Sequence, residues 1–147
     1  MQQMSRKILM SYDGSDLTGK IIDEVKVQTE GYKDSEIHIL SVVTQVGPAS
    51  HPGVALSIER EVAENIREEL KPIVQELIDA GYNAKAEVIV DQRQRNAGHK
   101  VVEYAEEEDV DLIVIGNRGL GNISGLFLGS VSSQVIQHAP CHVLVVK

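Results

Sequence analysis

The stretch best suited to chemistry is a glycine-rich segment, "GNRGLGNISGLFLGS", at residues 116–130. It holds five of the chain's twelve glycines and joins an apolar run to a segment of helical character. Glycine backbones reach positive φ and let N–H groups approach an anion with no Cβ in the way. The helix that follows adds unpaired N–H groups and the positive end of its dipole. The combination predicts a binding site for a phosphorylated ligand, most simply a nucleotide.

Polar side chains within this segment could add hydrogen-bond donors. Asn117 and Arg118 are two of them, although Arg118 could equally lie on the surface. Ser130 either caps the helix or gives its hydroxyl to a phosphate oxygen. Magnesium is expected to arrive with the phosphates, because no residues with dedicated metal-ligand spacing are present. No water-activating base can be assigned either, so we assign no catalytic residue.

Two other glycine patterns resemble known phosphate-binding motifs and fail on detail. The segment "GSDLTGKI" nearly matches the P-loop pattern, but Ile21 stands where a Ser or Thr would hold magnesium. The segment "GLGNISG" has one residue too many before its last glycine to be a dinucleotide fingerprint. Neither segment is assigned as a site.

The apolar pattern predicts alternating strands and helices. Short segments rich in Ile, Leu and Val are expected to be buried strands, at residues 7–12, 36–43, 84–90, 111–116 and 142–147. Each pair of consecutive strands is separated by a segment with helical spacing, and these four segments are residues 18–31, 56–78, 96–109 and 130–140. This βαβαβαβαβ order predicts an α/β fold, a mostly parallel open sheet with helices on both faces. Residues 44–55 are expected to form an irregular connection.

This architecture predicts where a ligand binds. In open α/β sheets the crevice lies outside the carboxyl ends of the strands, where the strand order reverses. The strands at 7–12 and 111–116 can flank that reversal, which would bring Ser11, Tyr12 and Asp13 beside the glycine-rich segment. Asp13 either contacts the ligand there or caps the first helix.

Composition excludes several other kinds of protein. The formal net charge of −8 disfavours nucleic acid, and only Arg93, Arg95 and Lys100 hint at a basic cluster. One cysteine, Cys141, rules out an internal disulfide and is expected to be a small buried hydrophobe. No apolar stretch is long enough to span a bilayer, and the start has no signal-peptide pattern. We therefore expect one cytoplasmic domain, residues 1–147, without membrane contact.

The glycine-rich segment resembles the nucleotide-binding motif of the universal stress protein family. That motif has Gly, two residues, Gly, nine residues, then Gly and Ser or Thr. Here the positions are Gly116, Gly119, Gly129 and Ser130. The resemblance also covers "KILMSYDGS", "DLIVIGNRG" and "GSVSSQVIQHAPCHVLVVK", so it spans essentially the whole chain.

The resemblance implies five parallel strands in the order 3-2-1-4-5 with four helices, an adenine nucleotide alpha hydrolase-like fold, and usually a homodimer. It also implies ATP binding, with adenine near the first two strands and phosphates in the glycine-rich segment. Family roles carry over to Asp13 beside adenine and ribose, and to Val42 beside adenine through its backbone. By the same resemblance, the residues that surround ribose and phosphates would be Gly116, Asn117, Arg118, Gly119, Gly129, Ser130 and Val131.

Three functional hypotheses follow from the resemblance and the residues. The first is an ATP-binding regulatory or stress-survival protein that acts through nucleotide-dependent dimer or partner interactions. The second is a slow ATPase or a protein that phosphorylates itself. The third is an interaction module whose pocket is vestigial or takes AMP or cyclic AMP. The apolar edge strand at 142–147 favours pairing with a second copy in any of the three.

Overall fold

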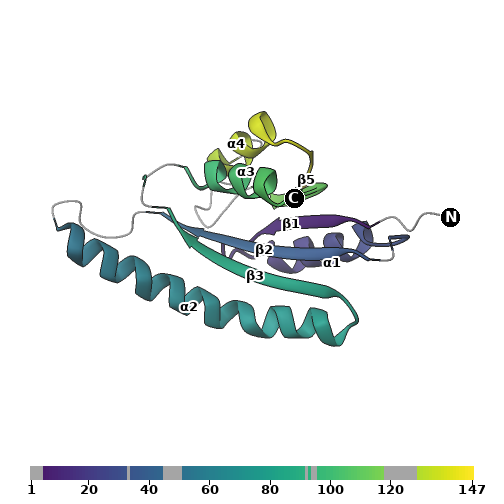
Figure 1. The fold of residues 1–147 in the computed structure, drawn as a ribbon, viewed down its shortest axis with the longest axis horizontal. Coiled ribbons are helices and arrows are strands. Elements are labelled where there is room, and N and C mark those ends of the chain that lie inside the picture. The colour runs from purple at the N-terminus through teal and green to yellow at the C-terminus, as the bar shows by residue number, and fades with distance from the viewer. Residues whose placement is uncertain (1–4, 33, 45–50, 92, 94–95, 118–128) are drawn as a thin grey trace.

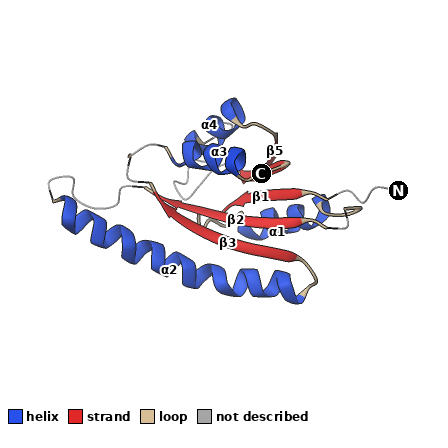
Figure 2. Cartoon of the chain, viewed as in Figure 1, coloured by secondary structure: helices blue, strands red, loops and turns tan. Residues whose placement is uncertain are grey.

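A computed structural model shows one sheet of five strands covered by two helices on each face (Figures 1 and 2). The structure describes residues 5–32, 34–44, 51–91, 93, 96–117 and 129–147. The strands are β1 Lys7–Ser11, β2 Glu36–Val43, β3 Asn83–Val90, β4 Leu112–Gly116 and β5 His142–Val146. The helices are α1 Thr18–Gln28, α2 Pro52–Asp79, α3 Ala97–Glu107 and α4 Ser130–His138.

The strand order is β3-β2-β1-β4-β5, and all four pairings are parallel. This confirms the predicted open α/β sheet and its order. β1 is central, with Ile8 aligned to Ile37 of β2 on one side and to Leu112 of β4 on the other. From β1 the chain adds β2 and then β3 on one side. It then returns to the other side of β1, where it adds β4 and then β5. The reversal therefore lies between β1 and β4.

Alternate residues of each strand feed two separate hydrophobic cores. Ile8 and Met10 face the core under α1 and α2, whereas Leu9 faces the core under α3 and α4. The prediction of five buried strands is correct for β1, β2 and β4 but wrong for the edge strands. β5 is only half-buried, and most of the first five residues of β3 are exposed, because an edge strand has a neighbour on one side only.

Helix ends follow local backbone chemistry. α2 ends at Asp79, and Gly81 beyond it adopts a φ of +97°, as expected for a C-terminal glycine. The expected irregular connection at 44–55 is too long, because α2 already begins at Pro52, whose fixed φ suits the first helical turn. Within the described part of the chain, no helix is both long and apolar enough to cross a membrane.

A buried polar pair joins β2 to α3. His38 of β2 is 1% exposed, and its Nδ1 lies 2.8 Å from the hydroxyl of Tyr104 on α3. Burial lowers the pKa of His38, and Lys85 of β3 and Lys7 of β1 add to that effect. Glu36, 3.5 Å from Nε2, opposes the shift and does not reverse it. The imidazole is therefore held neutral in the folded protein.

This pair should make folding sensitive to acid. The folded-state pKa of His38 lies below the unfolded value of 6.5, so its contribution to stability is complete above that value and declines as the pH falls below it. We expect His38→Gln, which cannot take up a proton, to lose less unfolding free energy than wild type between about pH 7.5 and about pH 5. Denaturant unfolding at both pH values measures the difference. Equal losses in the two proteins would show that His38 does not couple to folding.

Candidate functional site

Beyond the carboxyl ends of β1 and β4, each segment stays hydrogen-bonded to its outer neighbouring strand, whereas the last β1–β4 pair is Met10 with Val114. Just past β1, Tyr12 N donates to Leu40 O of β2 at 2.8 Å. Just past β4, Asn117 N donates to Val146 O of β5 at 2.9 Å. The segments that follow β1 and β4 therefore both leave the sheet at the reversal of strand order. Open α/β sheets bind their ligands at this point.

The start of α4 is fixed against the end of β4. Gly129 N donates to Asn117 O at 2.8 Å, so the two ends of the glycine-rich segment meet. Ser132 Oγ donates to Gly116 O at 2.7 Å and adds a second link. The N-terminus of α4, with its unpaired N–H groups, therefore lies at the carboxyl edge of β4. Arg118 and Gly119 fall in residues 118–128, outside the described residues.

The predicted capping role of Ser130 is wrong. α4 begins at Ser130, and the N-cap is Gly129, which makes no side-chain capping hydrogen bond. Glycine is tolerated at this position, since its backbone can take the extended conformation seen here. Ser130 is exposed and Val131 is half-buried in the first turn. The Ser130 hydroxyl is thus not committed to capping its own helix.

Asp13 belongs to a tight turn and does not cap α1. Its Oδ1 accepts a hydrogen bond from Ser15 N at 2.9 Å, and Gly14 between them has a φ of +77°. α1 has Leu17 as its N-cap, without a side-chain cap, so the capping alternative for Asp13 is incorrect. The turn holds an exposed carboxylate directly after β1.

Tyr12 and Val42 lie on opposite faces of the sheet. The Tyr12 hydroxyl donates to Glu69 Oε2 of α2 at 2.9 Å. Burial, together with that carboxylate, raises the pKa of Tyr12 to about 12, so its hydroxyl stays protonated at neutral pH. Val42 packs against the core under α3 and α4, one residue before the end of β2. Ser11 ends β1 and is half-buried.

The site contains a polar atom that the described protein leaves unpaired. Among the described residues, Asn117 Oδ1 is buried and has no hydrogen-bond partner. Buried polar atoms normally have a partner, so an orphan beside a helix N-terminus points to a ligand with donor groups. Ribose hydroxyls are such donors, and the N–H groups of α4 suit phosphate oxygens. The residues present therefore fit a nucleotide.

Sequence reasoning missed Asp91 at the same edge. Asp91 follows β3, is 4% exposed, and its N donates to Val43 O at 2.8 Å. Its Oδ1 accepts from the backbone N of Arg93, whose side chain is exposed. The available signal was a carboxylate directly after an apolar strand. Over the part of the chain that the structure describes, no three His, Cys, Asp or Glu side chains gather as a metal site.

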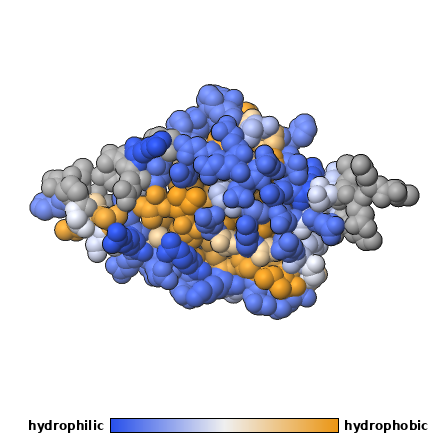
Figure 3. All heavy atoms as spheres, in the orientation of Figure 1, coloured by the Kyte–Doolittle hydropathy of each residue, from blue (hydrophilic) through white to orange (hydrophobic). Residues whose placement is uncertain are grey.

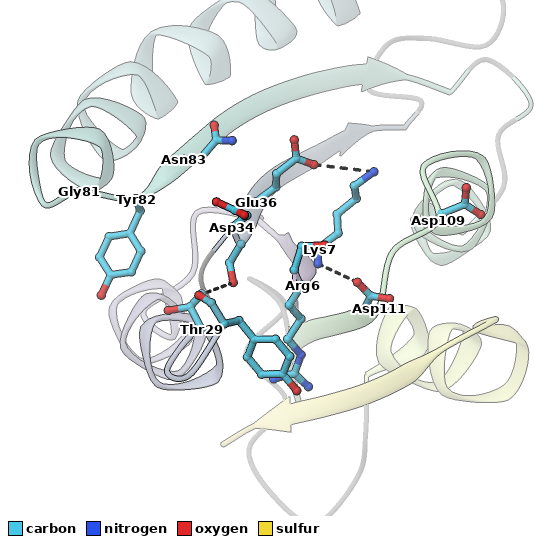
Figure 4. Close-up of a pocket in the computed structure, with 13 residues that line it drawn as sticks. Arg6, Lys7, Thr29, Asp34, Glu36, Gly81, Tyr82, Asn83, Asp109 and Asp111 are labelled. Atoms are coloured by element: carbon cyan, nitrogen blue, oxygen red, sulfur yellow. Dashed lines mark hydrogen bonds and ion pairs between the residues drawn. The ribbon is translucent and has the colours of Figure 1, made fainter. Parts of the chain in front are cut away.

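Two hollows lie away from this edge. One, of about 750 Å³, is at the amino ends of the strands, where Figure 4 shows Lys7 between Glu36 and Asp111. Lys7 Nζ is 3.7 Å from Glu36 Oε2, and Lys7 N donates to Asp111. The other is a groove between α2 and β3, where Figure 3 shows hydrophobic side chains at the surface. Neither hollow contains a predicted site residue.

The fold and the site together define a class of protein. The order 3-2-1-4-5, with a glycine-rich segment leading from β4 into α4, is the architecture of an open α/β nucleotide-binding domain. The model of the universal stress protein family matches residues 4–147, so the chain belongs to that family. It is 32% identical to universal stress protein YxiE of Bacillus subtilis, over 98% of this chain and all of that protein. A universal stress protein of Thermus aquaticus is also 32% identical, with the same coverage.

Solved structures give the same result. The chain is similar to universal stress protein UspA from Lactobacillus plantarum, with a TM-score of 0.83 and 23% identity, over 99% of this chain and all of the other. It is also similar to protein MJ0577 of Methanocaldococcus jannaschii, with a TM-score of 0.76 and 30% identity, over 98% of this chain and 96% of the other. The expected resemblance and fold are thereby confirmed.

Proposed function

We propose that this universal stress protein binds ATP at the carboxyl edge of β1 and β4. One observation carries the proposal: the hydrogen bond from Gly129 N to Asn117 O places the start of α4 at the reversal of strand order. Helix N-termini favour phosphate there, because their unpaired N–H groups and dipole complement negative charge.

Each part of the nucleotide has residues suited to it. Backbone N–H groups of Gly129, Ser130 and Val131 would hold phosphates, and the Ser130 hydroxyl is available as a further donor. Gly116 and Asn117 would lie along ribose and phosphates, with Arg118 and Gly119 added by the sequence motif. Ser11, Tyr12, Asp13 and Val42 would border adenine and its sugar. Magnesium would enter with the phosphates, which supply most of its ligands.

Relatives support adenine nucleotides as the ligand class. One similar structure is a universal stress protein in complex with cAMP, with a TM-score of 0.58 and 24% identity. Another is the universal stress protein of Archaeoglobus fulgidus in complex with dAMP, with a TM-score of 0.63 and 17% identity. Those ligands carry one phosphate, so AMP and cyclic AMP are the natural competitors of ATP in a test.

The biological role would be regulatory. Of the carboxylates at this edge, Asp13 Oδ1 accepts a hydrogen bond within its own turn and Asp91 Oδ1 accepts one from Arg93 N, and we assign neither as a base for hydrolysis. Bound nucleotide would order the site and change a surface that partners contact. β5 is a half-buried edge strand, which suits pairing with a second copy to give a homodimer. Light scattering should then give twice the mass of one chain.

Release of bound nucleotide tests the proposal. Protein purified without added nucleotide should, on heat denaturation, release ATP that chromatography identifies and quantifies. Titration calorimetry with ATP, AMP and cyclic AMP would then rank them, and ATP should bind most tightly because its extra phosphates add contacts at α4. An empty protein that takes up none of the three would refute nucleotide binding. Tighter binding of AMP would refute the assignment to ATP.

A further inference from the structure

β3 is an outer strand of the sheet, and the middle of the strand is open to solvent. Figure 1 shows β3 at the margin of the sheet with α2 running beside it. Lys85, Ala86 and Glu87 are all exposed. The outer side of an edge strand presents backbone N–H and C=O groups with which another strand can pair. The kind of occupant that suits this edge is therefore a further β-strand.

A groove of about 860 Å³ lies between this edge and α2. Its apolar lining comes from Leu70 and Val74 of α2 and from Ala86 and Val88 of β3. Successive side chains of a strand point to opposite faces of a sheet, so every second side chain of an added strand would enter this groove. Edge strands with such pockets for alternate side chains are a recurring site of strand addition.

The cations at the rim of the groove are balanced on their own helix. Arg67 Nη1 lies 2.9 Å from Glu64 Oε2, and Lys71 Nζ lies 2.7 Å from Glu68 Oε1. These pairs give the flank of α2 a mixture of both charges. The charges that choose between possible partner strands are therefore those of β3 itself.

Two opposite charges on β3 select which strand fits. Lys85 and Glu87 point away from α2, because they alternate with residues of the core under α1 and α2. A second β3, antiparallel and centred on Ala86, would set Lys85 opposite the partner's Glu87 and Glu87 opposite the partner's Lys85. Centring the pair one residue away in either direction would bring two lysines or two glutamates together. The charges therefore favour one register.

We infer that two copies of this chain associate through antiparallel pairing of their β3 edges, centred on Ala86. A two-fold axis at this residue makes the contact self-complementary, as in most closed pairs of identical chains. Ala86 lies opposite its own copy and Ala84 opposite Val88, so small side chains meet on the α2 side. The interface is separate from β5, and it would join dimers formed through β5 edge to edge. It also leaves the carboxyl ends of β1 and β4 uncovered, since β1 is two strands away from β3.

Light scattering over a range of protein concentrations tests the interface with two charge-reversed variants. Lys85→Glu and Glu87→Lys each place like charges opposite one another, and each should weaken association through β3 about 10- to 100-fold. An equimolar mixture of the two variants restores opposite charges and should recover the wild-type mass. Glu61→Lys, an exposed change on α2 outside the groove, should keep that mass. A pH of 8 suits the measurement, because Lys85 lowers the pKa of His38 from its ordinary value of 6.5 and that imidazole should stay neutral in every variant.

Ala86→Glu gives an independent disruption if a charge-reversed variant fails to fold. The position is exposed, so the melting temperature should match wild type, while two carboxylates opposite one another at the centre should weaken association. Hydrogen exchange locates the contact: amides of residues 85–87 should gain protection with rising concentration in wild type and not in Ala86→Glu.

Two results would overturn the inference. One is the same mass for wild type and all variants at every concentration, which would leave the groove to a strand of another protein. In that case a mass of two chains would keep the dimer through β5, and a mass of one chain would refute that dimer as well. The other is a loss of mass in Lys85→Glu and Glu87→Lys that their mixture does not restore.

Discussion

Gly98→Ala should destabilise the protein by about 1–3 kcal/mol, the usual cost of overpacking a dense contact. A Cβ at Gly98 would lie 2.8 Å from Gln134 Cβ and 2.9 Å from Val131 O. The backbone oxygen cannot rotate away, so α3 and α4 would have to separate. Because α4 supplies the proposed phosphate contacts, ATP affinity should fall together with the melting temperature. Thermal unfolding and calorimetry measure the two effects.

Gly19→Ala is the matched control for this substitution. Gly19 is also near the start of a helix, α1, but a Cβ there meets no atom within 4 Å. Alanine should therefore leave stability unchanged or raise it by up to about 1 kcal/mol, through its better helix propensity. ATP affinity should match wild type. Equal stability in Gly98→Ala and Gly19→Ala would contradict the close packing of α3 on α4.

Ser130→Asp should raise the stability of the free protein and lower its affinity for ATP. An acidic side chain in the first turn of α4 interacts favourably with the helix dipole, and should stabilise the free protein by about 0.3–1 kcal/mol. The same carboxylate would compete with phosphate for the N–H groups of α4 and repel it. We expect ATP affinity to fall about 100-fold, equivalent to about 2.7 kcal/mol. Melting curves and calorimetry, both at low salt, report the two quantities.

Ser130→Asn controls for the shape of the new side chain. It has the size of Asp without the charge, so it should weaken ATP binding by less than about tenfold, the loss of one hydroxyl contact. If Ser130→Asp binds ATP as well as Ser130→Asn does, phosphate does not lie at the start of α4. The proposed orientation of the nucleotide would then be wrong.

The fold could be predicted because its signals are local. Short apolar runs alternated with helical spacing, and parallel strands joined by helices leave few possible topologies. Helix ends were predictable where a residue decides them alone, as with Gly81. Pro52 also suits a helix start, yet it was included in the loop because the expected pattern of α2 began at Leu56. The exposure of β3 could not be predicted, because it depends on β3 being an edge strand, and the order of strands in the sheet cannot be read from a short stretch of sequence.

The site was predictable in outline and less so in detail. Asp13 and Asn117 were identified from strand ends, but no sequence pattern shows that Asp13 closes a turn or that Asn117 Oδ1 is left unpaired. His38 lies within an apolar strand, and its partner Tyr104 is 66 residues away in the chain.

Residue-resolved nucleotide titration tests most directly whether the carboxyl edge of β1 and β4 is an ATP site. Amide NMR spectra of isotope-labelled protein would be recorded with increasing ATP and magnesium. The amide signals of Asp13, Asn117, Ser130 and Val131 should shift together and saturate, while that of Asn83 at the amino edge stays in place. Saturable shifts confined to the amino edge, or no shift at any ATP concentration, would contradict the account.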